Sequence, residues 1–414
     1  MPGFNKREPL ARIAADAAAR VMDRTSATMS LMSEASPVQG ELPRWAEWTS
    51  SQPYTVGLEE EVMLLDGHDG LLVNCGEQVL RRLPPELGSH ASAETHEATV
   101  ELASAPHRTA RGAAGDAAAL RQGLALELAG QNMLAASAGT HPLAHWTGTK
   151  ISRAARYKIV YDSMRELARR EPTFGLHVHV GVADADKAIV LQNRLRAHLP
   201  LLLALSVNSP FWQGRDTGFA STRTPIFQAF PRVGVPRAFP CYSEYVEAID
   251  QLLRCGAFPG PTFVWWDVRL QAGLGTVETR VMDAQTTVAD TLALVALVQT
   301  IAHLELEEGY QPRRLIHADE VIQENRFLAA RDGMSARFID PVAGRRVSAV
   351  ESLDHLLRAA RSHAEELGCE DALAHVAEMA HHTGASRQRQ IAKAHGVGSV
   401  APALAELFAP RLAR

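Results

Sequence analysis

The segment YTVGLEEEVMLL, residues 54–65, alternates apolar and polar residues with the period of a β-strand. Side chains two residues apart on a strand point to the same face, so Glu59 and Glu61 lie together. The opposite face carries an apolar set that Glu60 interrupts, namely Tyr54, Val56, Leu58, Val62 and Leu64. This pattern predicts a strand in a sheet that packs one face on a core. Taken alone, two neighbouring glutamates are more typical of a solvent-exposed sheet face than of a functional site.

A second segment, AETHEATVELASAP, repeats the arrangement of carboxylates. If the chain is extended from residue 97, Glu97 and Glu101 share a face, and Val100 and Leu102 occupy the other. Glu94 lies just before this strand. On its own the segment is also compatible with a surface strand.

Two further segments place ionisable side chains on one face of a strand. In GLHVHVG, residues 175–181, His177 and His179 point the same way, and the flanking glycines leave room for a ligand or another strand. In LGTVETRVMD, Glu278 and Arg280 project together. A structural histidine pair explains the first pattern as well as a ligand pair does, and a simple ion pair explains the second.

The four strands together change this balance. An antiparallel sheet with one face on helices would carry an intensely charged second face, and carboxylates at that density repel one another unless cations compensate them. Carboxylates with one or two imidazoles and no thiolate suit Mg²⁺ or Mn²⁺ better than zinc. Magnesium with few protein ligands in turn implies bound phosphates, most often those of ATP, and arginines in the same site would neutralise a transferring phosphoryl group.

The chain alternates strand-like and helix-like segments before a helical end. Strands are predicted at 54–65, 97–104, 174–182, 264–270 and 276–283, and helices at 109–131, 156–170, 184–206, 242–255 and 286–308. Beyond residue 312 the pattern is helical except at 337–340. This order favours an α+β fold over a doubly wound parallel sheet. The Pro- and Gly-rich segment 210–240 is too long for a plain connection and predicts a functional loop over a site.

Composition excludes several classes of protein. The 42 basic residues nearly balance the 47 acidic ones, and no basic run interleaves with aromatic residues, which argues against a nucleic-acid partner. Four dispersed cysteines without a CxxC motif predict neither a disulfide framework nor a cysteine-ligated zinc site, and they favour a reducing cytoplasm. The apolar stretches 199–207 and 291–304 are shorter than the roughly 20 residues that a membrane span needs, so we expect no membrane partner.

Eight motifs in order carry a family resemblance: GLEEE, ETHEATVELAS, GTHP, GLHVHVG, SVNSPFWQGRDTGFASTR, WWDVR, GTVETRVMD and GASRQRQ. From about residue 54 to residue 408 the chain resembles the carboxylate-amine ligases of the type 2 glutamate-cysteine ligase family. The resemblance implies an antiparallel, glutamine-synthetase-like catalytic sheet backed by helices, which binds ATP and more than one Mg²⁺. It also implies a homodimer.

The resemblance implies roles for individual residues as well. The family's metal-site positions match Glu59, Glu61, Glu94, Glu97, Glu101, His177 and Glu278. It leaves open which of the three glutamates at 94, 97 and 101 contact metal. It implies that His179 contacts the metal ligands rather than the metal itself. Arg280 and Arg269 are the expected contacts to phosphate or developing charge. In the long loop segment, the expected substrate-binding residues are Arg223, Asn208 and Trp212.

Two departures from the family pattern accompany the predicted domain organisation. The N-terminal extension is atypically long, and Leu270-Gln271 stand where relatives often carry Pro-Ser. We expect neither departure to touch the predicted metal residues. The chain is predicted to comprise an N-terminal extension (1–50), a catalytic α+β domain (51–311) and a mostly helical region packed on it (312–414).

The implied reaction joins a carboxylic acid to an amine through an acyl phosphate, with the γ-carboxylate of glutamate and the amine of cysteine as the namesake substrates. One rival is a metal-dependent hydrolase, because His-x-His on a strand also opens the metal site of amidohydrolase barrels. There the pair lies on an early strand, whereas here it lies in mid-chain and carboxylates dominate. A second rival is a catalytically silent protein that holds a nucleotide or an amino acid on the same fold.

Overall fold

The structure is a computed structural model that describes residues 42–170 and 172–409. The described residues from Arg44 to residue 409 form one compact unit. Most of the predicted N-terminal extension, residues 1–41, lies outside the described residues.

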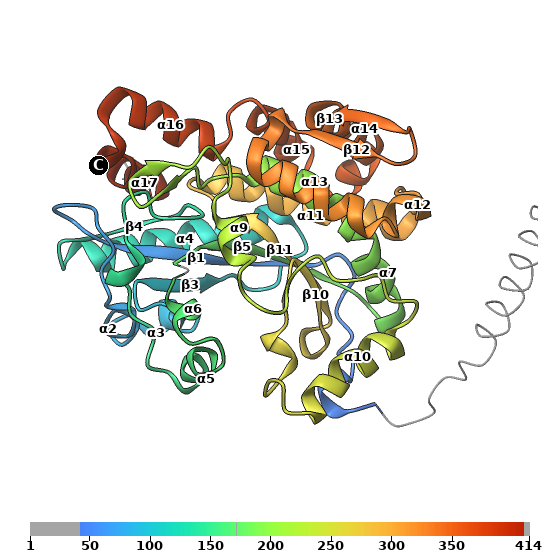
Figure 1. The fold of residues 1–414 in the computed structure, drawn as a ribbon, viewed down its shortest axis with the longest axis horizontal. Helices are drawn as coiled ribbons and strands as arrows, with labels where there is room; N and C mark the ends of the chain where they lie inside the picture. The colour runs from blue at the N-terminus through green and yellow to red at the C-terminus, as the bar shows by residue number, and fades with distance from the viewer. Residues whose placement is uncertain (1–41, 171, 410–414) are drawn as a thin grey trace, which may run out of the picture. The chain divides into compact units, whose positions relative to one another are not determined.

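A seven-stranded sheet occupies the middle of this unit (Figure 1). Its strand order is β10-β11-β5-β1-β3-β2, and β4 pairs with β1 beyond the end of β5. Each of these pairings is antiparallel. The strands are β1 (Val56–Asp66), β2 (Ala91–Ala93), β3 (Thr99–Ala103), β4 (Met133–Ala136), β5 (Gly175–Gly181), β10 (Val268–Gln271) and β11 (Thr276–Asp283). The predicted α+β class, with an antiparallel sheet, is therefore confirmed.

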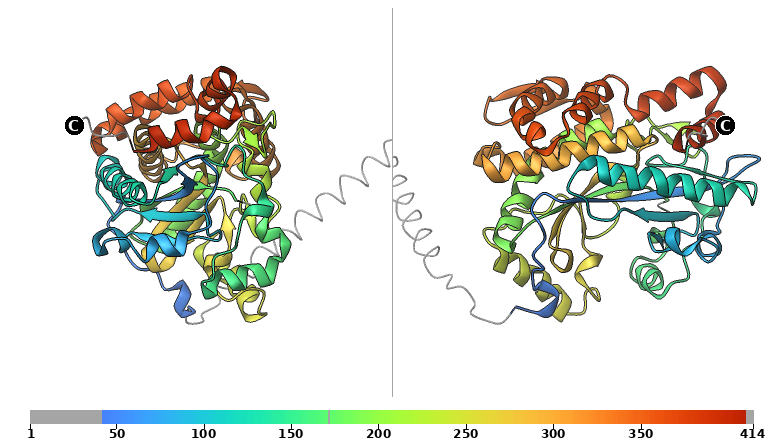
Figure 2. Two further views of the ribbon diagram at one scale, coloured as in Figure 1. Left: turned by 90° about the vertical axis from the view of Figure 1, so that its left-hand side faces the viewer. Right: turned by 180° about the vertical axis from the view of Figure 1, so that it is seen from behind.

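Helices cover one face of this sheet, as Figure 2 shows from behind. They are α4 (Ala110–Ala129), α7 (Ala185–Leu195), α8 (Leu199–Ser206) and α11 (Val288–Glu307). The side chain of Thr109 caps the start of α4, and that of Thr287 caps α11, each by accepting a hydrogen bond from a backbone N–H in the first turn. The apolar face of β1 packs on α4 and α11, with Leu58, Val62 and Leu64 almost fully buried.

Among the described residues, α11 alone is long and apolar enough to cross a membrane by length and composition. In the folded chain 78% of its apolar window is buried. It contacts α4 and α7 and also two later helices, α14 (Ala349–Leu367) and α15 (Glu370–Met379). The helix therefore has the burial of a core element.

A second helical layer is built from the C-terminal part of the chain. It comprises α12 (Arg313–Ile316), α13 (Asp319–Asp332), α14 (Ala349–Leu367), α15 (Glu370–Met379), α16 (Gly384–His395) and α17 (Val400–Phe408). Helix α13 packs on α8, and α17 packs on β4. The segment predicted as extended at 337–340 is β12 (Arg337–Asp340), and it forms a hairpin with a strand that sequence analysis missed, β13 (Arg345–Ser348). A domain boundary at residues 311 and 312 stays a prediction.

The opposite side of the sheet is covered only in part. Figures 1 and 2 agree in placing α5 (Ala155–Met164) and α6 (Glu166–Arg169) on this side, away from α11. The unit also contains two short helices, α2 (Gly76–Leu80) and α3 (Pro85–Gly88), and the longer helix α10 (Tyr242–Arg254). The predicted loop 210–240 contains β6 (Phe211–Trp212), β7 (Arg215–Asp216), α9 (Arg223–Phe227) and β8 (Val233–Gly234).

Several predicted elements are broken in the structure. The strand expected at 264–270 is two strands, because β9 (Trp265–Trp266) pairs with β8 whereas β10 begins after Asp267. The carboxylate of Asp267 pairs with Arg326, and its carbonyl accepts a hydrogen bond from the Arg280 N–H at 2.7 Å. The helix expected at 156–170 breaks at Arg165, whose φ is 56°.

Candidate functional site

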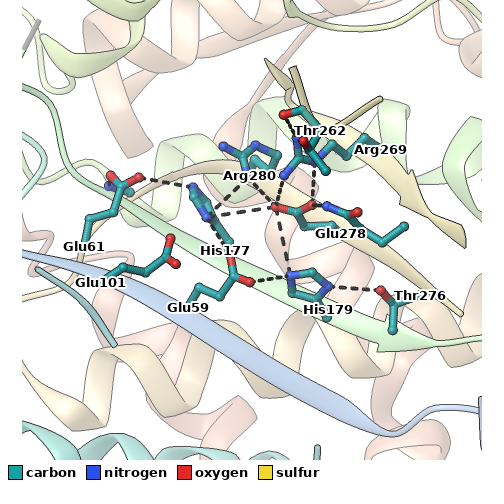
Figure 3. Close-up of polar contacts among 12 residues, drawn as sticks. Glu59, Glu61, Glu101, His177, His179, Thr262, Arg269, Thr276, Glu278 and Arg280 are labelled. Atoms are coloured by element: carbon teal, nitrogen blue, oxygen red, sulfur yellow. Dashed lines mark hydrogen bonds and ion pairs between the residues drawn. The ribbon is translucent and has the colours of Figure 1, made fainter. Parts of the chain in front are cut away.

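Strand register brings the predicted charged residues onto the sheet face opposite α11. Glu59 lies opposite His177 on β5, and Glu61 lies opposite Glu101 on β3. On the other side of β5, His179 lies opposite Glu278 of β11, which in turn lies opposite Arg269 of β10. Side chains that lie opposite one another in an antiparallel pair share a face, so five strands contribute to one polar surface (Figure 3).

The ionisable side chains on this face form three overlapping groups. In each group one ligand atom from every member lies within 4.8 Å of the others. The groups are Glu59, His179 and Glu278; Glu59, Glu101 and His177; and Glu61, Glu94 and Glu101. The structure thus brings together six of the seven residues predicted at metal positions. It also puts His179, which was expected behind the ligands, within one of the groups.

The group of Glu59, His179 and Glu278, which we call the Glu278 group, lies beside two arginine side chains. Arg269 donates to Glu278 through Nε at 2.6 Å, and Arg280 donates to the same carboxylate. Although burial opposes ionisation, these two guanidinium groups hold the pKa of Glu278 well below its usual value. Hydrogen bonds with His177 and His179 likewise overcome burial and lower the pKa of Glu59. Glu59 and Glu278 are therefore ionised carboxylates with partners inside the protein.

The group of Glu61, Glu94 and Glu101, which we call the Glu61 group, has fewer positive charges beside its carboxyl groups. Burial raises the pKa of all three of its carboxyl groups, and neighbouring carboxylates add to the rise for Glu61 and Glu101. The pKa of Glu61 reaches about 7. The protein's own contacts to the group are few: the Gly175 N–H donates to Glu61, the Thr95 N–H to Glu94, and the Ser92 hydroxyl to Glu101. Three carboxyl groups therefore lie together with too little positive charge nearby to neutralise them when all three are ionised.

His177 lies between these two groups. Its Nδ1 is 3.3 Å from Glu59, and its Nε2 is buried with no hydrogen-bond partner. Burial, reinforced by Arg280, lowers the pKa of His177 to about 4, so the ring is neutral near pH 7. A neutral ring nitrogen without a partner beside under-neutralised carboxylates is a donor set that fits a divalent cation, and the predominance of carboxylate oxygens fits Mg²⁺ or Mn²⁺.

A cavity opens beside the carboxylates. Its walls are Glu61, Glu94, Thr95, His96, Thr99, Val160, Met164, Thr173, His177, Arg223, Phe227, Phe230, Trp265 and Arg280. Arg223 is 5% exposed, and it donates to the Val281 and Arg280 carbonyls at 3.3 Å while its Nε has no partner. Burial lowers the pKa of Arg223, and its closest carboxylate is that of Asp283, at 4.0 Å. The guanidinium therefore retains capacity for an anion in the cavity.

Three of the predicted site residues lie away from the carboxylate groups and the cavity. Glu97 precedes β3 and pairs with Arg153 at 3.4 Å. Asn208 is fully buried, and its side chain donates to the Ala284 carbonyl at 2.8 Å. Trp212 belongs to the β6–β7 hairpin and is half-buried there.

One expectation about the family departures is wrong. The side-chain amide of Gln271, one of the two departing residues, donates to the Glu278 carboxylate at 2.7 Å. Alternation along the strand could have indicated this contact, because Gln271 follows Arg269 by two residues and shares its face. The departure therefore adds a third hydrogen-bond donor to a predicted metal residue.

Sequence analysis also missed the partner of Glu60. This glutamate lies on the helix side of β1, fully buried, and accepts from Arg121 of α4 at 2.6 and 2.8 Å. Thr291 of α11 donates to it as well, at 2.8 Å. The signal that could have found the pair is an arginine in an otherwise apolar stretch of α4, because a buried charge requires an opposite charge nearby.

Comparison with known proteins places these features in a family. The family model of glutamate-cysteine ligase family 2 matches residues 55–406. The chain is 40% identical over 344 residues to "Putative glutamate–cysteine ligase 2-1" of Rubrobacter xylanophilus, covering 83% of this chain and 91% of that protein. It is 37% identical over 360 residues to "Putative glutamate–cysteine ligase 2" of Thermobifida fusca, covering 85% and 90%.

Two solved structures share the fold at 13% identity. One is a glutamate–cysteine ligase from Francisella tularensis in complex with AMP, with a TM-score of 0.63 over 88% of this chain and 91% of that one. The other is a bifunctional glutathione synthetase from Pasteurella multocida, with a TM-score of 0.66 over 86% of this chain and 52% of that one. At this identity the likeness concerns the arrangement of helices and strands.

Proposed function

The chain belongs to glutamate-cysteine ligase family 2, and on this premise we propose that it is an ATP-dependent carboxylate-amine ligase. The observation that carries the proposal is the group of Glu61, Glu94 and Glu101, whose ligand atoms lie within 4.8 Å of one another beside a cavity that Arg223 and Arg280 also line. Cations that bind phosphates would compensate such a group. The AMP complex of the Francisella ligase supports a nucleotide as one ligand of this fold.

In the proposed reaction, an oxygen of the substrate carboxylate attacks the γ-phosphorus of ATP and releases ADP. The resulting acyl phosphate is attacked by the amine, which loses a proton as inorganic phosphate leaves and the amide forms. Phosphorylation is needed because carboxylate oxygen is a poor leaving group. Bound Mg²⁺ or Mn²⁺ would neutralise phosphate charge. The residues that would hold the cations are Glu59, Glu61, Glu94, Glu101, His177 and Glu278.

The arginines have separable roles in this proposal. Arg280 lines the cavity and contacts Glu278, so it would offset charge on the transferring phosphoryl group. Arg269 is anchored by Glu278 and by the carbonyls of Thr262 and Val264, and it would contribute mainly by fixing that carboxylate. Arg223 would bind a substrate carboxylate, for which its planar guanidinium is suited.

The other predicted contacts have weaker support. The side chain of Asn208 donates to the Ala284 carbonyl and accepts from the side chain of Gln388. We therefore assign Asn208 to holding the loop that precedes Arg223. Glu97 pairs with Arg153 and would not contact metal. A substrate contact by Trp212 stays a prediction.

The specific substrates proposed are glutamate, through its γ-carboxylate, and cysteine. The test is phosphate release and product formation by purified protein with ATP and Mg²⁺, first with glutamate with and without cysteine and then with a panel of other acids and amines. Glu278→Ala serves as the inactive control. Release that requires both an acid and an amine, and that disappears in the control, supports a ligase, and the productive pair identifies the substrates.

The two rival functions predict different results. A metal-dependent hydrolase would cleave its substrate without consuming ATP. A silent binding protein would bind ATP and release no phosphate with any pair of substrates. The carboxylate-dominated site and the family favour the ligase over both.

Two further expectations stay predictions. A homodimer would give twice the chain mass of 45.0 kDa in sedimentation equilibrium. A cytoplasmic location is testable by fractionating cells that produce the protein.

A further inference from the structure

We propose that helix α16 is a clamp that positions the substrate-binding arginine, Arg223, from outside the site. The helix carries the family-like motif GASRQRQ, which none of the steps above employs. The inference rests on the proposed function, because it assigns Arg223 to the substrate acid. The positioning residues are Gln388 and Arg389.

The segment between the end of α8 and Arg223 is a loop closed on itself, which we call the 208–222 loop. Its two ends meet where the Thr222 N–H donates to the Ser209 carbonyl at 2.8 Å. Arg223 follows directly, and its N–H donates to the Ser209 hydroxyl at 3.2 Å. The direction in which Arg223 leaves the loop therefore depends on where residue 209 is held.

Asp283, at the end of β11, holds the base of this loop. Its carboxylate is fully buried and accepts hydrogen bonds from the Asn208 N–H at 2.8 Å and from the hydroxyls of Ser209 and Ser221 at 2.7 and 2.9 Å. The strand that carries Glu278 and Arg280 thus fixes the loop from one side.

Helix α16 fixes the same base from the other side. The side-chain amide of Gln388, which is fully buried, donates to both the carbonyl and the side-chain oxygen of Asn208, at 2.7 and 2.9 Å. Gly384 permits this approach, because a Cβ there would lie 2.1 Å from the Asn208 side-chain oxygen. The Ala385 N–H adds a hydrogen bond to the Val207 carbonyl at 2.9 Å.

Arg389 holds the far end of the loop. Its guanidinium makes a two-point contact with the Asp216 carboxylate, at 2.8 and 2.9 Å, and also donates to the Phe219 carbonyl at 2.9 Å. The hydrogen bonds from Arg389 lower the pKa of Asp216. Planar two-point geometry fixes orientation as well as distance, which a single lysine contact would not do.

One residue of α16 provides a matched control. Arg387 lies on the same helix and also pairs with an aspartate, but its partner is Asp290 of α11, at 3.1 Å, outside the loop. Loss of Arg387 removes an ion pair from α16 without releasing the 208–222 loop. A difference between the Arg387 and Arg389 variants therefore reports on the clamp.

The kinetic test compares Arg389→Ala with Arg387→Ala in the full chain. We expect Arg389→Ala to raise KM for the carboxylic acid about tenfold while KM for ATP changes less than about twofold, and Arg387→Ala to change neither. The exchanged pair Asp216→Arg with Arg389→Asp should recover most of the loss, because it restores the contact. Equal effects of the two single variants, or parallel changes in both KM values, would overturn the clamp.

A second measurement separates the clamp from the proposed function. Hydrogen exchange of backbone amides, followed by mass spectrometry, should rise at residues 208–227 in Arg389→Ala and stay at the wild-type rate in Arg387→Ala. Unchanged exchange in Arg389→Ala would overturn the clamp whether or not the protein turns over substrate. Absence of turnover by the wild type with every acid and amine would instead count against the ligase.

Discussion

The three consecutive glutamates of β1 lie in two different electrostatic environments. Glu60 points to the helices, where Arg121 and Thr291 satisfy its carboxylate inside the protein. Glu61 points to the other face, where Glu94 and Glu101 lie within 4.8 Å. When these three carboxyl groups ionise, they require positive charge nearby. One strand therefore supplies, from adjacent positions, a carboxylate paired inside the protein and a carboxylate that we propose to bind a cation.

Glu60 and Glu61 differ in the partners that the chain supplies. The carboxylate that stabilises the fold has its complete set of partners in the chain, and Arg121 is in turn fixed by the carbonyls of Gln285 and Thr286. The carboxylates that face the cavity share few donors and lie near an unpartnered imidazole nitrogen of His177. A bound cation can supply the positive charge that these carboxylates lack in the protein alone.

The largest expected effect is on the helix side of β1. Glu60→Ala leaves the Arg121 guanidinium buried without its counter-charge, and we expect the free energy of unfolding to fall by about 3–5 kcal/mol. Urea unfolding measures the change. The double replacement of Glu60 and Arg121 by leucine should cost less than the single change, and a double variant that is less stable than Glu60→Ala would contradict this account of the pair.

The next effect is the pH dependence that Glu61 imparts to the metal-free protein. Its pKa of about 7 in the folded state exceeds the ordinary 4.5, so the folded chain retains a proton that the unfolded chain releases. The associated stability is fully present below about pH 4.5, declines as pH rises, and is lost above about pH 7, a change of roughly 3 kcal/mol. Glu61→Gln should make this decline smaller in urea titrations across the pH range, while Glu94 and Glu101, whose pKa values burial also raises, retain the remainder. Parallel curves for both proteins would contradict the role of Glu61.

A smaller effect is expected from magnesium itself. A cation that binds only the folded state at a hundred times its dissociation constant stabilises that state by about 2.7 kcal/mol. We expect MgCl₂ to raise the thermal midpoint of the wild type, and Glu101→Gln to lose most of this rise while its metal-free midpoint is maintained or increased. An equal response to MgCl₂ in both proteins would place the cation elsewhere.

The smallest effect is expected for an ion pair in solvent. Arg361 and Glu365 on α14 lie 3.3 Å apart, with 82% and 54% of their side chains exposed. Because water screens this pair, Arg361→Ala should lower the free energy of unfolding by less than about 0.5 kcal/mol. A loss close to that of Glu60→Ala would show that burial is not what separates the two pairs.

The sequence was informative where a residue's environment follows from its neighbours in the chain. Alternation predicted β1, β5 and β11, and therefore the shared face of Glu59, His177 and Glu278. The α+β class followed from the order of strands and helices. The family resemblance added Glu94, which is outside a strand and which no periodicity could have placed.

The rest depended on contacts between distant segments. Nothing local distinguishes Glu97, which pairs with Arg153, from Glu101, which joins the carboxylate group. The strand expected at 264–270 is broken at Asp267, which pairs with Arg326, more than fifty residues later in the chain. The partner of Glu60 lies 61 residues away, and Gln388 lies 180 residues from Asn208. Such pairings are set by how the layers pack.

Helix α11 also has a consequence for how the protein is made. Its apolar surface is covered by α4 and α7, which the ribosome synthesises earlier, and by α14 and α15, which emerge later. Until those later helices are synthesised, part of this long apolar helix faces water, and by length and composition the helix resembles a transmembrane segment. The unfinished chain is therefore most prone to aggregate between the synthesis of α11 and that of α15, and chaperone capture is most useful in that interval.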